Sequence, residues 1–245
     1  KLKKGYVQSL DDAVAGKVDA VIKGGVDPML AHRFDEQGHK IKYPAFCQKK
    51  LDGHRAIAMV RDGKVTLWSR TRKPITGVPH IVAAVEALGL DDGTILDGEL
   101  YHHDYRQNFE ELTSFIRQVT PKAGHEVVQY HVYDLPSHAN RSFADRSAII
   151  AGLNLTNPLV TVTTVKVYNE DALTEAFEAF VAEGYEGAMV RNSDSPYVNK
   201  RSYDLLKVKE FSDDEFVVTG VEEGRGKLAG HAIFVCLTKG GGEFR

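Results

Sequence analysis

The sequence has few cysteines, no long apolar run and no phosphate-loop motif, and each absence excludes a class of protein. Its 245 residues include two cysteines, Cys47 and Cys236, which lie far apart and match no zinc-ligand spacing. This excludes a disulfide-stabilised scaffold and favours a reducing compartment. No apolar stretch approaches the ~18 residues that a membrane span needs. Neither GxxxxGK[ST] nor GxGxxG occurs, so neither a P-loop nor a Rossmann dinucleotide site is expected.

Positive charge is not in excess, but it is segregated along the chain. The 31 Lys and Arg residues are offset by 34 Asp and Glu residues, which gives a net charge of −3. Residues 42–73 nevertheless carry many basic side chains and only two acids, Asp52 and Asp62. A second basic group spans residues 200–209. A single charged run usually marks a solvated surface, but this segregation favours an anionic ligand or nucleic acid on one face.

The hydrophobic pattern predicts an α+β protein. The composition, 42% hydrophobic and 27% charged, is that of a globular chain. Strands are predicted at 45–48, 55–61, 64–69, 94–101, 127–135, 160–167, 187–191 and 205–209. Helices are predicted at 79–89, after a cap at Asn108, at 142–153, and from a cap at Asn169 to Gly184. The dipeptide Asp62-Gly63 between two of the strands predicts a tight hairpin.

The pattern changes after Phe211. Two β-patterned runs, 215–221 and 231–237, surround a glycine-rich turn, with no helix between them. We therefore expect a first domain over residues 1–210 and a second over residues 211–245. Thirty-five residues are too few to close a β-barrel, so we expect the second domain to be incomplete at Arg245, within what looks like a third strand. The chain begins at Lys1 rather than Met, so we also expect an N-terminal piece to precede it.

Six short segments contain the residues that could take part in catalysis or ligand binding. In chain order they are Lys49-Lys50-Leu51-Asp52-Gly53, Ser69-Arg70, Leu96-Asp97-Gly98-Glu99, Tyr133-Asp134, Glu186 to Arg191, and Lys207-Val208-Lys209. Each alone is typical of a surface turn, a core aromatic or the face of a strand. Lys207 and Lys209 share one face because side chains alternate along a strand. His102, His103, His131 and His138 fit no metal-ligand spacing, and we interpret them as structural or surface residues.

In this order and spacing the segments resemble the covalent nucleotidyltransferase superfamily and, within it, the ATP-dependent DNA ligases of the minimal phage or bacterial type. The resemblance runs from about Pro28 to about Leu237. It implies an α+β nucleotidyltransferase (ATP-grasp-like adenylation) domain, followed by the start of a β-barrel OB-fold domain. The implied activity is the sealing of nicks in duplex DNA, as in replication, repair and recombination, through a lysyl-AMP enzyme and a 5′-adenylated DNA.

The resemblance also implies a role for each site residue. Lys50 is the implied nucleophile, and Lys49 is excluded because Asp-Gly follows the nucleophile at the second and third positions. Arg55 and Glu99 are implied to bind the ribose, Tyr133 to stack on adenine, and Gln48 to border the adenine edge. Glu186 and Glu99 are implied to lie at Mg²⁺, and Lys207 and Lys209 at the α-phosphate. Arg70 is implied to stand by the phosphates or the nick.

Elementary chemistry is consistent with a lysine nucleophile. A lysine must be neutral to attack phosphorus, yet its ordinary pKa is ~10.4. Desolvation and neighbouring cations lower that pKa, whereas arginine stays protonated. Carboxylates suit Mg²⁺, which bridges to substrate phosphates.

Several alternatives and partner predictions accompany this interpretation. The chain could instead be an RNA ligase or an mRNA-capping-type nucleotidyltransferase, since these share Lys-x-Asp-Gly. It could also be an inactive module that binds a nucleotide or a nick. We expect ATP as AMP donor, nicked double-stranded DNA as partner, no membrane association, a monomer, and the cytoplasm of a bacterial or phage-infected cell.

Overall fold

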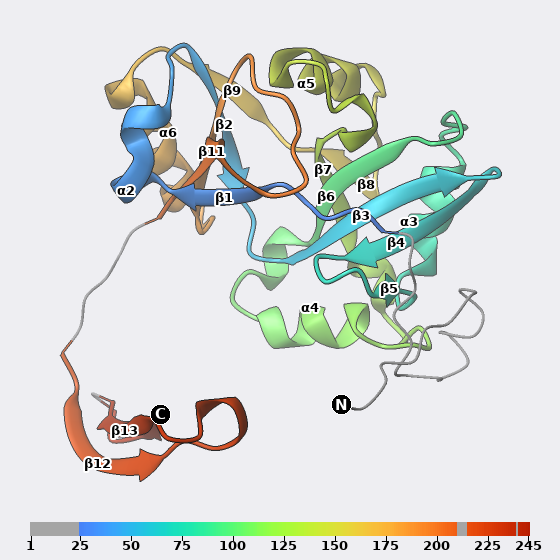
Figure 1. Ribbon diagram of the computed structural model, residues 1–245. Coiled ribbons are helices and arrows are strands. Elements are labelled where there is room, and N and C mark those ends of the chain that lie inside the picture. Colours follow the sequence, from blue (N-terminus) through green and yellow to red (C-terminus); the bar gives the residue numbers. More distant parts are fainter. Residues whose placement is uncertain (1–24, 210–214, 239) are drawn as a thin grey trace. The chain divides into compact units, whose positions relative to one another are not determined.

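The computed structural model describes residues 25–209, 215–238 and 240–245 (Figure 1). The chain divides into two compact units, Lys1–Lys209 and Glu210–Arg245. The residues on either side of the expected boundary, 210 and 211, lie outside the described residues, as do the first 24 residues of the expected first domain. No helix in the described ranges is long and apolar enough to cross a membrane.

The first unit contains a five-stranded sheet built from segments distant in sequence. Its strand order is β1 (Leu30–Arg33), β11 (Arg201–Val208), β10 (Gly187–Asn192), β2 (Ala45–Lys50) and β9 (Thr164–Val167). β1 pairs with β11 in parallel, and the other neighbours are antiparallel. Because Gly187 lies opposite Lys50, the start of β10 meets the end of β2.

A six-stranded sheet forms the other half of this unit. Its order is β5 (Pro74–Ile75), β4 (Lys64–Ser69), β3 (His54–Arg61), β6 (Ile95–Tyr101), β7 (Gln129–Asp134) and β8 (Leu159–Thr161). The predicted hairpin is confirmed, since β3 and β4 are antiparallel and Asp62 and Gly63 have φ values of 52° and 70°. Both residues of a type I′ turn require such left-handed backbone.

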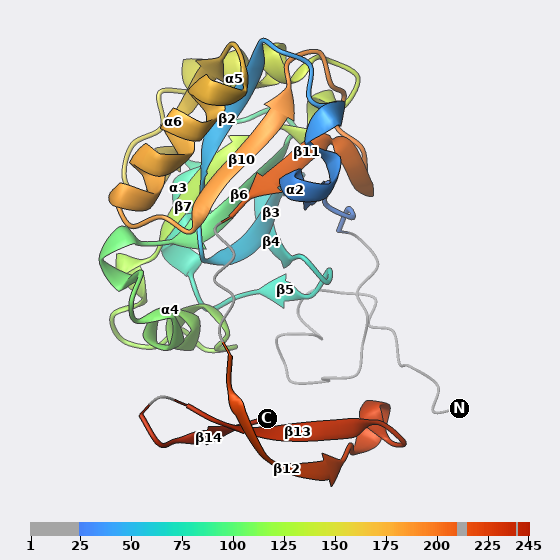
Figure 2. The same ribbon diagram turned by 90° about the vertical axis from the view of Figure 1, so that its left-hand side faces the viewer.

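Helices cover the outer faces of the two sheets. They are α2 (Phe34–Gln37), α3 (Pro79–Glu86), α4 (Phe109–Ile116), α5 (Phe143–Gly152) and α6 (Glu170–Ala182). Figure 2 shows α6 lying along β2 and β10, where Leu173 and Phe180 are buried against Cys47 and Val190. The larger core lies between the six-stranded sheet and α3, α4 and α5.

Side chains cap the first turns of α5 and α6 but not that of α4. Ser142 accepts a hydrogen bond from the amide of Asp145, and Asn169 accepts one from the amide of Ala172 at 2.8 Å. The Asn108 side chain instead donates to Glu111 Oε2 at 2.5 Å and caps no backbone amide. Phe109, the first residue of α4, is 37% exposed and stacks on His54.

Two strand predictions are wrong in extent. The run 160–167 is not one strand, because β8 pairs with β7 in one sheet and β9 pairs with β2 in the other. The sequence offered no sign of this change of partner, since Val162 and Thr163 between them are also β-formers. β11 begins at Arg201 rather than 205, and β1 was not predicted. The residues of β1 and the first residues of β11 form strands because they pair with each other, although they lie far apart in the sequence.

The second unit is a small antiparallel sheet. Its strands are β12 (Val217–Glu223), β13 (Ala232–Leu237) and β14 (Glu243–Phe244), in that order. Two strands around a glycine-rich turn were predicted, and the turn contains a single 3₁₀ segment, Gly226–Leu228. The chain enters a third strand before Arg245, as expected.

Candidate active site

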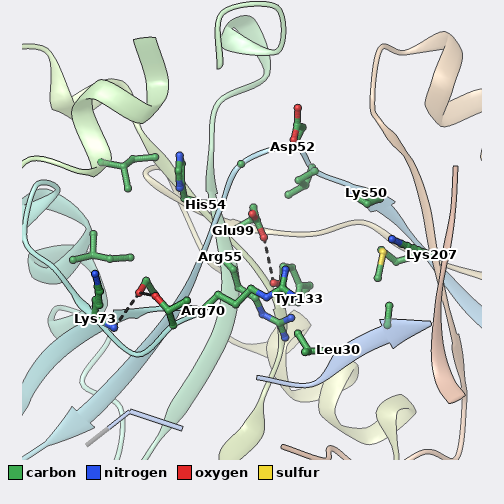
Figure 3. Close-up of a pocket in the computed structure, with 18 of the residues that line it drawn as sticks. Leu30, Lys50, Asp52, His54, Arg55, Arg70, Lys73, Glu99, Tyr133 and Lys207 are labelled. Carbon is green, nitrogen blue, oxygen red and sulfur yellow. Dashed lines mark hydrogen bonds between the residues drawn. The ribbon is translucent and has the colours of Figure 1, made fainter. Parts of the chain in front are cut away.

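A cavity of about 940 Å³ lies between the two sheets of the first unit. Strands β2, β10 and β11 of one sheet and β3, β6 and β7 of the other contribute to its lining, and Figure 3 shows the inward-facing side chains. Basic residues outnumber acidic ones, since Asp52 and Glu99 are the acidic residues among the described lining. Such a lining favours an anionic ligand.

Lys50 ends β2 with its side chain directed into this region. Because side chains alternate, Gln48 and Lys50 share one face of β2, and Lys49 lies on the other. The ammonium of Lys50 pairs with Glu186 Oε2, and that of Lys209 pairs with Glu186 Oε1. Burial lowers the pKa of Lys50, although the charges of Glu99 and Asp52 partly oppose this. A basic group that has lost part of its water is easier to convert to a nucleophile.

Lys209 and Lys207 supply further positive charge. Both line the cavity, as the alternation along β11 predicts. Lys207 lies opposite Met189 of β10, and Lys209 follows the end of β11. Burial and the charge of Lys50 lower the pKa of Lys209.

Glu99 and Tyr133 form the opposite wall, from β6 and β7. The Tyr133 hydroxyl donates to Glu99 Oε2 at 3.4 Å, as drawn in Figure 3. Burial raises the pKa of Glu99 to about 8, against the charge of Arg55, which lowers it. Burial also raises the pKa of Tyr133 well above its usual value. The pair therefore presents a neutral phenol next to a carboxyl group whose ionised form is disfavoured by burial.

Arg55 is fixed by the strands around it. Its Nε and Nη2 donate to the two oxygens of Asp97 at 2.9 and 2.5 Å, and its Nη1 donates to the carbonyl of Met29 at 2.7 Å. Three of its five N–H donors are used in this way, which leaves two for a ligand. The guanidinium carbon lies 5.7 Å from the centroid of the Tyr133 ring.

Gln48 is also held in place. Its Nε2 donates to Thr164 Oγ1 at 2.8 Å and to the carbonyl of Tyr133 at 3.4 Å. With both amide hydrogens engaged, its carbonyl oxygen remains as the group that can accept a hydrogen bond from a ligand.

Arg70 lies apart from the other predicted residues. It belongs to the turn between β4 and β5 and lines the cavity with Lys73 and Arg117. Figure 3 shows Arg70 beside Lys73, at the opposite end of the view from Lys50 and Lys207. The cavity thus has basic groups at both ends.

Two glycines allow close backbone approaches, Gly53 between the loop after Lys50 and β6, and Gly98 between β6 and β7. A Cβ on Gly53 would come within 2.4 Å of the carbonyl oxygen of Leu100, and one on Gly98 within 2.5 Å of that of His131. Neither distance is compatible with a side chain. The glycines of Asp52-Gly53 and Asp97-Gly98 therefore have a packing role.

One buried network was missed by sequence reasoning. Asp134, fully buried, accepts from Arg146 Nε at 2.7 Å and pairs with Arg191 of β10. Burial lowers the pKa values of Arg146 and Arg191 to about 10. The network ties β7, just after Tyr133, to β10 and α5. The sequence signal was a strongly polar pair, Asp134 and Arg191, at the ends of apolar strands.

The histidines singled out in the sequence make contacts within the fold. Among the described residues, no group of three His, Cys, Asp or Glu side chains could hold a metal ion. His103 contacts Tyr101 and Glu183, and His131 contacts Gln129. Their interpretation as structural residues agrees with these contacts.

Comparison with known proteins gives one matching family. The family model described as ATP-dependent DNA ligase domain matches residues 28–209. A DNA ligase of African swine fever virus (isolate Warthog/Namibia/Wart80/1980) is 30% identical over 232 residues, which cover 87% of this chain and 54% of the viral protein. The SPbeta prophage-derived DNA ligase-like protein LigB of Bacillus subtilis is 29% identical over 204 residues, which cover 80% and 71%. The chain thus spans about half the length of the viral relatives that it matches.

Solved structures show the same fold. A structure from a study of Lig E DNA ligases superposes with a TM-score of 0.73 at 27% identity, covering 91% of this chain and 83% of that one. The Chlorella virus DNA ligase-adenylate superposes with a TM-score of 0.61 at 21% identity, covering 90% and 84%. The mixed α/β nucleotidyltransferase-type fold agrees with that predicted from the sequence.

Proposed function

Because the chain belongs to the ATP-dependent DNA ligase domain family, we propose that it transfers AMP from ATP to Lys50, then to the 5′-phosphate of a nick, and seals the strand. The observation that carries this proposal is the position of Lys50. Its partly desolvated ammonium lies at a basic cavity and contacts Glu186, while Lys209 holds the other oxygen of that carboxylate.

In the first step the neutral amine of Lys50 attacks the α-phosphorus of ATP. A P–N bond forms, the bond from the α-phosphorus to the bridging oxygen breaks, and pyrophosphate leaves. Negative charge collects on the phosphate oxygens during such a displacement, so fixed cations stabilise the transition state. Lys207 and Lys209 are the proposed cations at the α-phosphate, because both line the cavity near the end of β2.

The nucleoside contacts follow from the opposite wall. Tyr133 offers a ring face to adenine, and stacking of this kind contributes ~1–3 kcal/mol. Gln48 offers its carbonyl oxygen to the adenine edge, since its amide hydrogens are engaged. Arg55 and Glu99 are the proposed ribose contacts, with two free N–H donors and a carboxyl group respectively. Arg70 is the proposed contact to the phosphates or the nick.

Glu186 and Glu99 are suitable ligands for the magnesium ion that the resemblance to ATP-dependent DNA ligases implies. Their oxygens are hard donors, and Mg²⁺ in proteins commonly takes one or two carboxylates, with waters and substrate phosphates completing its coordination. The pairing of Glu186 with two ammonium groups is evidence that this carboxylate can hold concentrated positive charge. When bound, Mg²⁺ would neutralise charge on the substrate phosphates.

Further parts of the proposal concern partners and place. Basic residues at both ends of the cavity support nicked duplex DNA as the second substrate, with the phosphate backbone as the main attraction. We propose that residues 1–210 are the adenylation domain, that residues 211–245 begin an OB-fold domain, and that the protein acts as a monomer. We also propose that it acts in the cytoplasm of a bacterial or phage-infected cell.

A label-transfer assay tests the activity. The chain is incubated with Mg²⁺ and α-labelled ATP, and nicked DNA is then added. We expect label on the protein first, then on the DNA 5′-end, and finally release of AMP with a sealed strand. Label from GTP but not ATP, or sealing of nicked RNA but not of DNA, would contradict the proposal. Lys50→Ala is the control and should acquire no label.

A further inference from the structure

The short connection from α6 to β10 carries Glu186, whose carboxylate pairs with two residues of the cavity lining, Lys50 and Lys209, and other side chains hold this connection in place. Residues 183–187 span this connection, and the amide of Glu186 donates to the carbonyl of Lys50 at 3.2 Å. Gly184, with φ of 90°, and Gly187, with φ of 148°, bend the backbone at both ends. The direction of Glu186 therefore depends on what holds the residues between these bends.

Lys49, which also belongs to the cavity lining, contacts this connection at two residues. Its ammonium lies 2.5 Å from Glu183 Oε2 and 4.4 Å from the centroid of the Tyr185 ring. Its side chain is 19% exposed, so this pair is better shielded than an ordinary surface ion pair. Lys49 and Lys50 are adjacent on β2 and contact the same connection at different residues, Glu183 and Glu186.

His103 also contacts the connection between α6 and β10. Its ring stacks on Tyr185, with centroids 4.4 Å apart, and its Nε2 donates to the carbonyl of Glu183 at 3.0 Å. That contact requires a proton on Nε2, so in the neutral ring Nδ1 accepts from the Tyr101 hydroxyl at 2.8 Å. Tyr185, one residue before Glu186, thus contacts both Lys49 and His103.

We propose that Lys49, acting through Glu183 and Tyr185, is a positioning residue that directs Glu186 toward Lys50 for adenylation. This inference rests on the proposed function. Lys49 does not react and takes no label. Instead it fixes a carboxylate whose small displacement would misalign the nucleophile, and misplacements of about 1 Å can cost up to a hundredfold in rate.

Substitutions at Lys49 and Glu183 test the role in single-turnover adenylation with varied ATP. Lys49→Met keeps the stem against Tyr185 but removes the charge. It should lower the maximal rate constant about tenfold, equivalent to about 1.4 kcal/mol, with little change in the ATP concentration for half-maximal rate. Lys49→Arg should restore most of the rate, because arginine can also pair with Glu183. Glu183→Gln changes the half-exposed partner of Lys49 and should show the same loss of adenylation rate. It serves as the test variant if Lys49→Met folds poorly.

Lys166→Met is the matched control. Lys166 lies on β9 of the same sheet, and its ammonium is 5.7 Å from the Tyr168 ring, away from the cavity lining. The control should leave the rate unchanged. A control as slow as Lys49→Met would mean that any lysine lost from this sheet slows the reaction, which would overturn the inference.

Two further readouts separate positioning from general stability. In a double-mutant cycle, Lys49→Met should cost little in a Glu186→Gln background, because its effect passes through Glu186. Hydrogen exchange of the ligand-free chain should rise within residues 183–187 in Lys49→Met and not in Lys166→Met. Additive effects in the cycle, or unchanged exchange with an unchanged rate, would overturn the inference. Failure of the unmodified chain to take label would instead overturn the proposed function.

Discussion

The buried Asp134 network gives the sharpest prediction for stability. Asp134→Asn keeps the shape of the side chain but removes the negative charge that Arg146 and Arg191 share. Both arginines are buried, at 0% and 3% exposure, so neither can recover its hydration without local unfolding. Breaking a buried ion pair from one side costs about 3–5 kcal/mol. That is a large fraction of the 5–15 kcal/mol typical of a whole domain.

Urea unfolding followed by fluorescence measures this cost. The single tryptophan, Trp68, is 5% exposed and lies in the same unit. With a slope of about 2 kcal/mol per M, a loss of 3–5 kcal/mol lowers the midpoint by about 1.5–2.5 M. Asp35→Asn is the control, because its pair with Arg33 is exposed and should not shift the midpoint measurably. Equal midpoints for the two variants would refute the assignment of Asp134 as a structural anchor of the strand that presents Tyr133.

Three other predictions concern metal, pH and salt. Glu186→Gln should raise the Mg²⁺ concentration needed for adenylation and be partly rescued by excess metal. Lys209→Ala removes a fixed charge, so excess metal should not rescue it. Identical metal titrations for Glu186→Gln and the unmodified chain would remove Glu186 from the metal site. Burial lowers the pKa of His131 from 6.5 to about 4, so the unfolded chain takes up its proton first, and stability should fall by up to about 3 kcal/mol as pH drops through this window. His131→Gln should flatten the dependence of stability on pH in this window. An unchanged dependence would contradict the attribution of the loss to His131. Affinity for nicked DNA should fall with salt at a log–log slope of about −0.9 per phosphate contact, and Arg70→Ala should reduce the slope by about one contact; a salt-independent affinity would exclude phosphate binding.

Local features of the fold were predictable from the sequence because their causes are local. The hairpin at Asp62-Gly63 needs two left-handed residues in succession, and only a few dipeptides supply them. The helix after Asn169 combines a capping side chain, an apolar stripe and a glycine after its end. Each of these signals lies within one turn or one helix, so the sequence contains all of the information.

Features that depend on distant partners were not predictable in the same way. β1 is a strand because it pairs with β11, about 170 residues later, and the run 160–167 divides because its two halves find different sheets. The same limit applies to the site. The position of Asp52-Gly53 distinguished Lys50 from Lys49 in the sequence, but the pairing of Lys49 with Glu183 became visible only when α6 was placed against β2.

Locating the AMP on the chain tests the central claim most directly. After incubation with Mg·ATP, intact mass and peptide mapping should give one added AMP, attached to Lys50. Lys50→Ala should carry none, and Lys49→Met should carry its AMP on Lys50. An AMP on Lys49, or a Lys50→Ala chain that still becomes adenylated, would contradict the account.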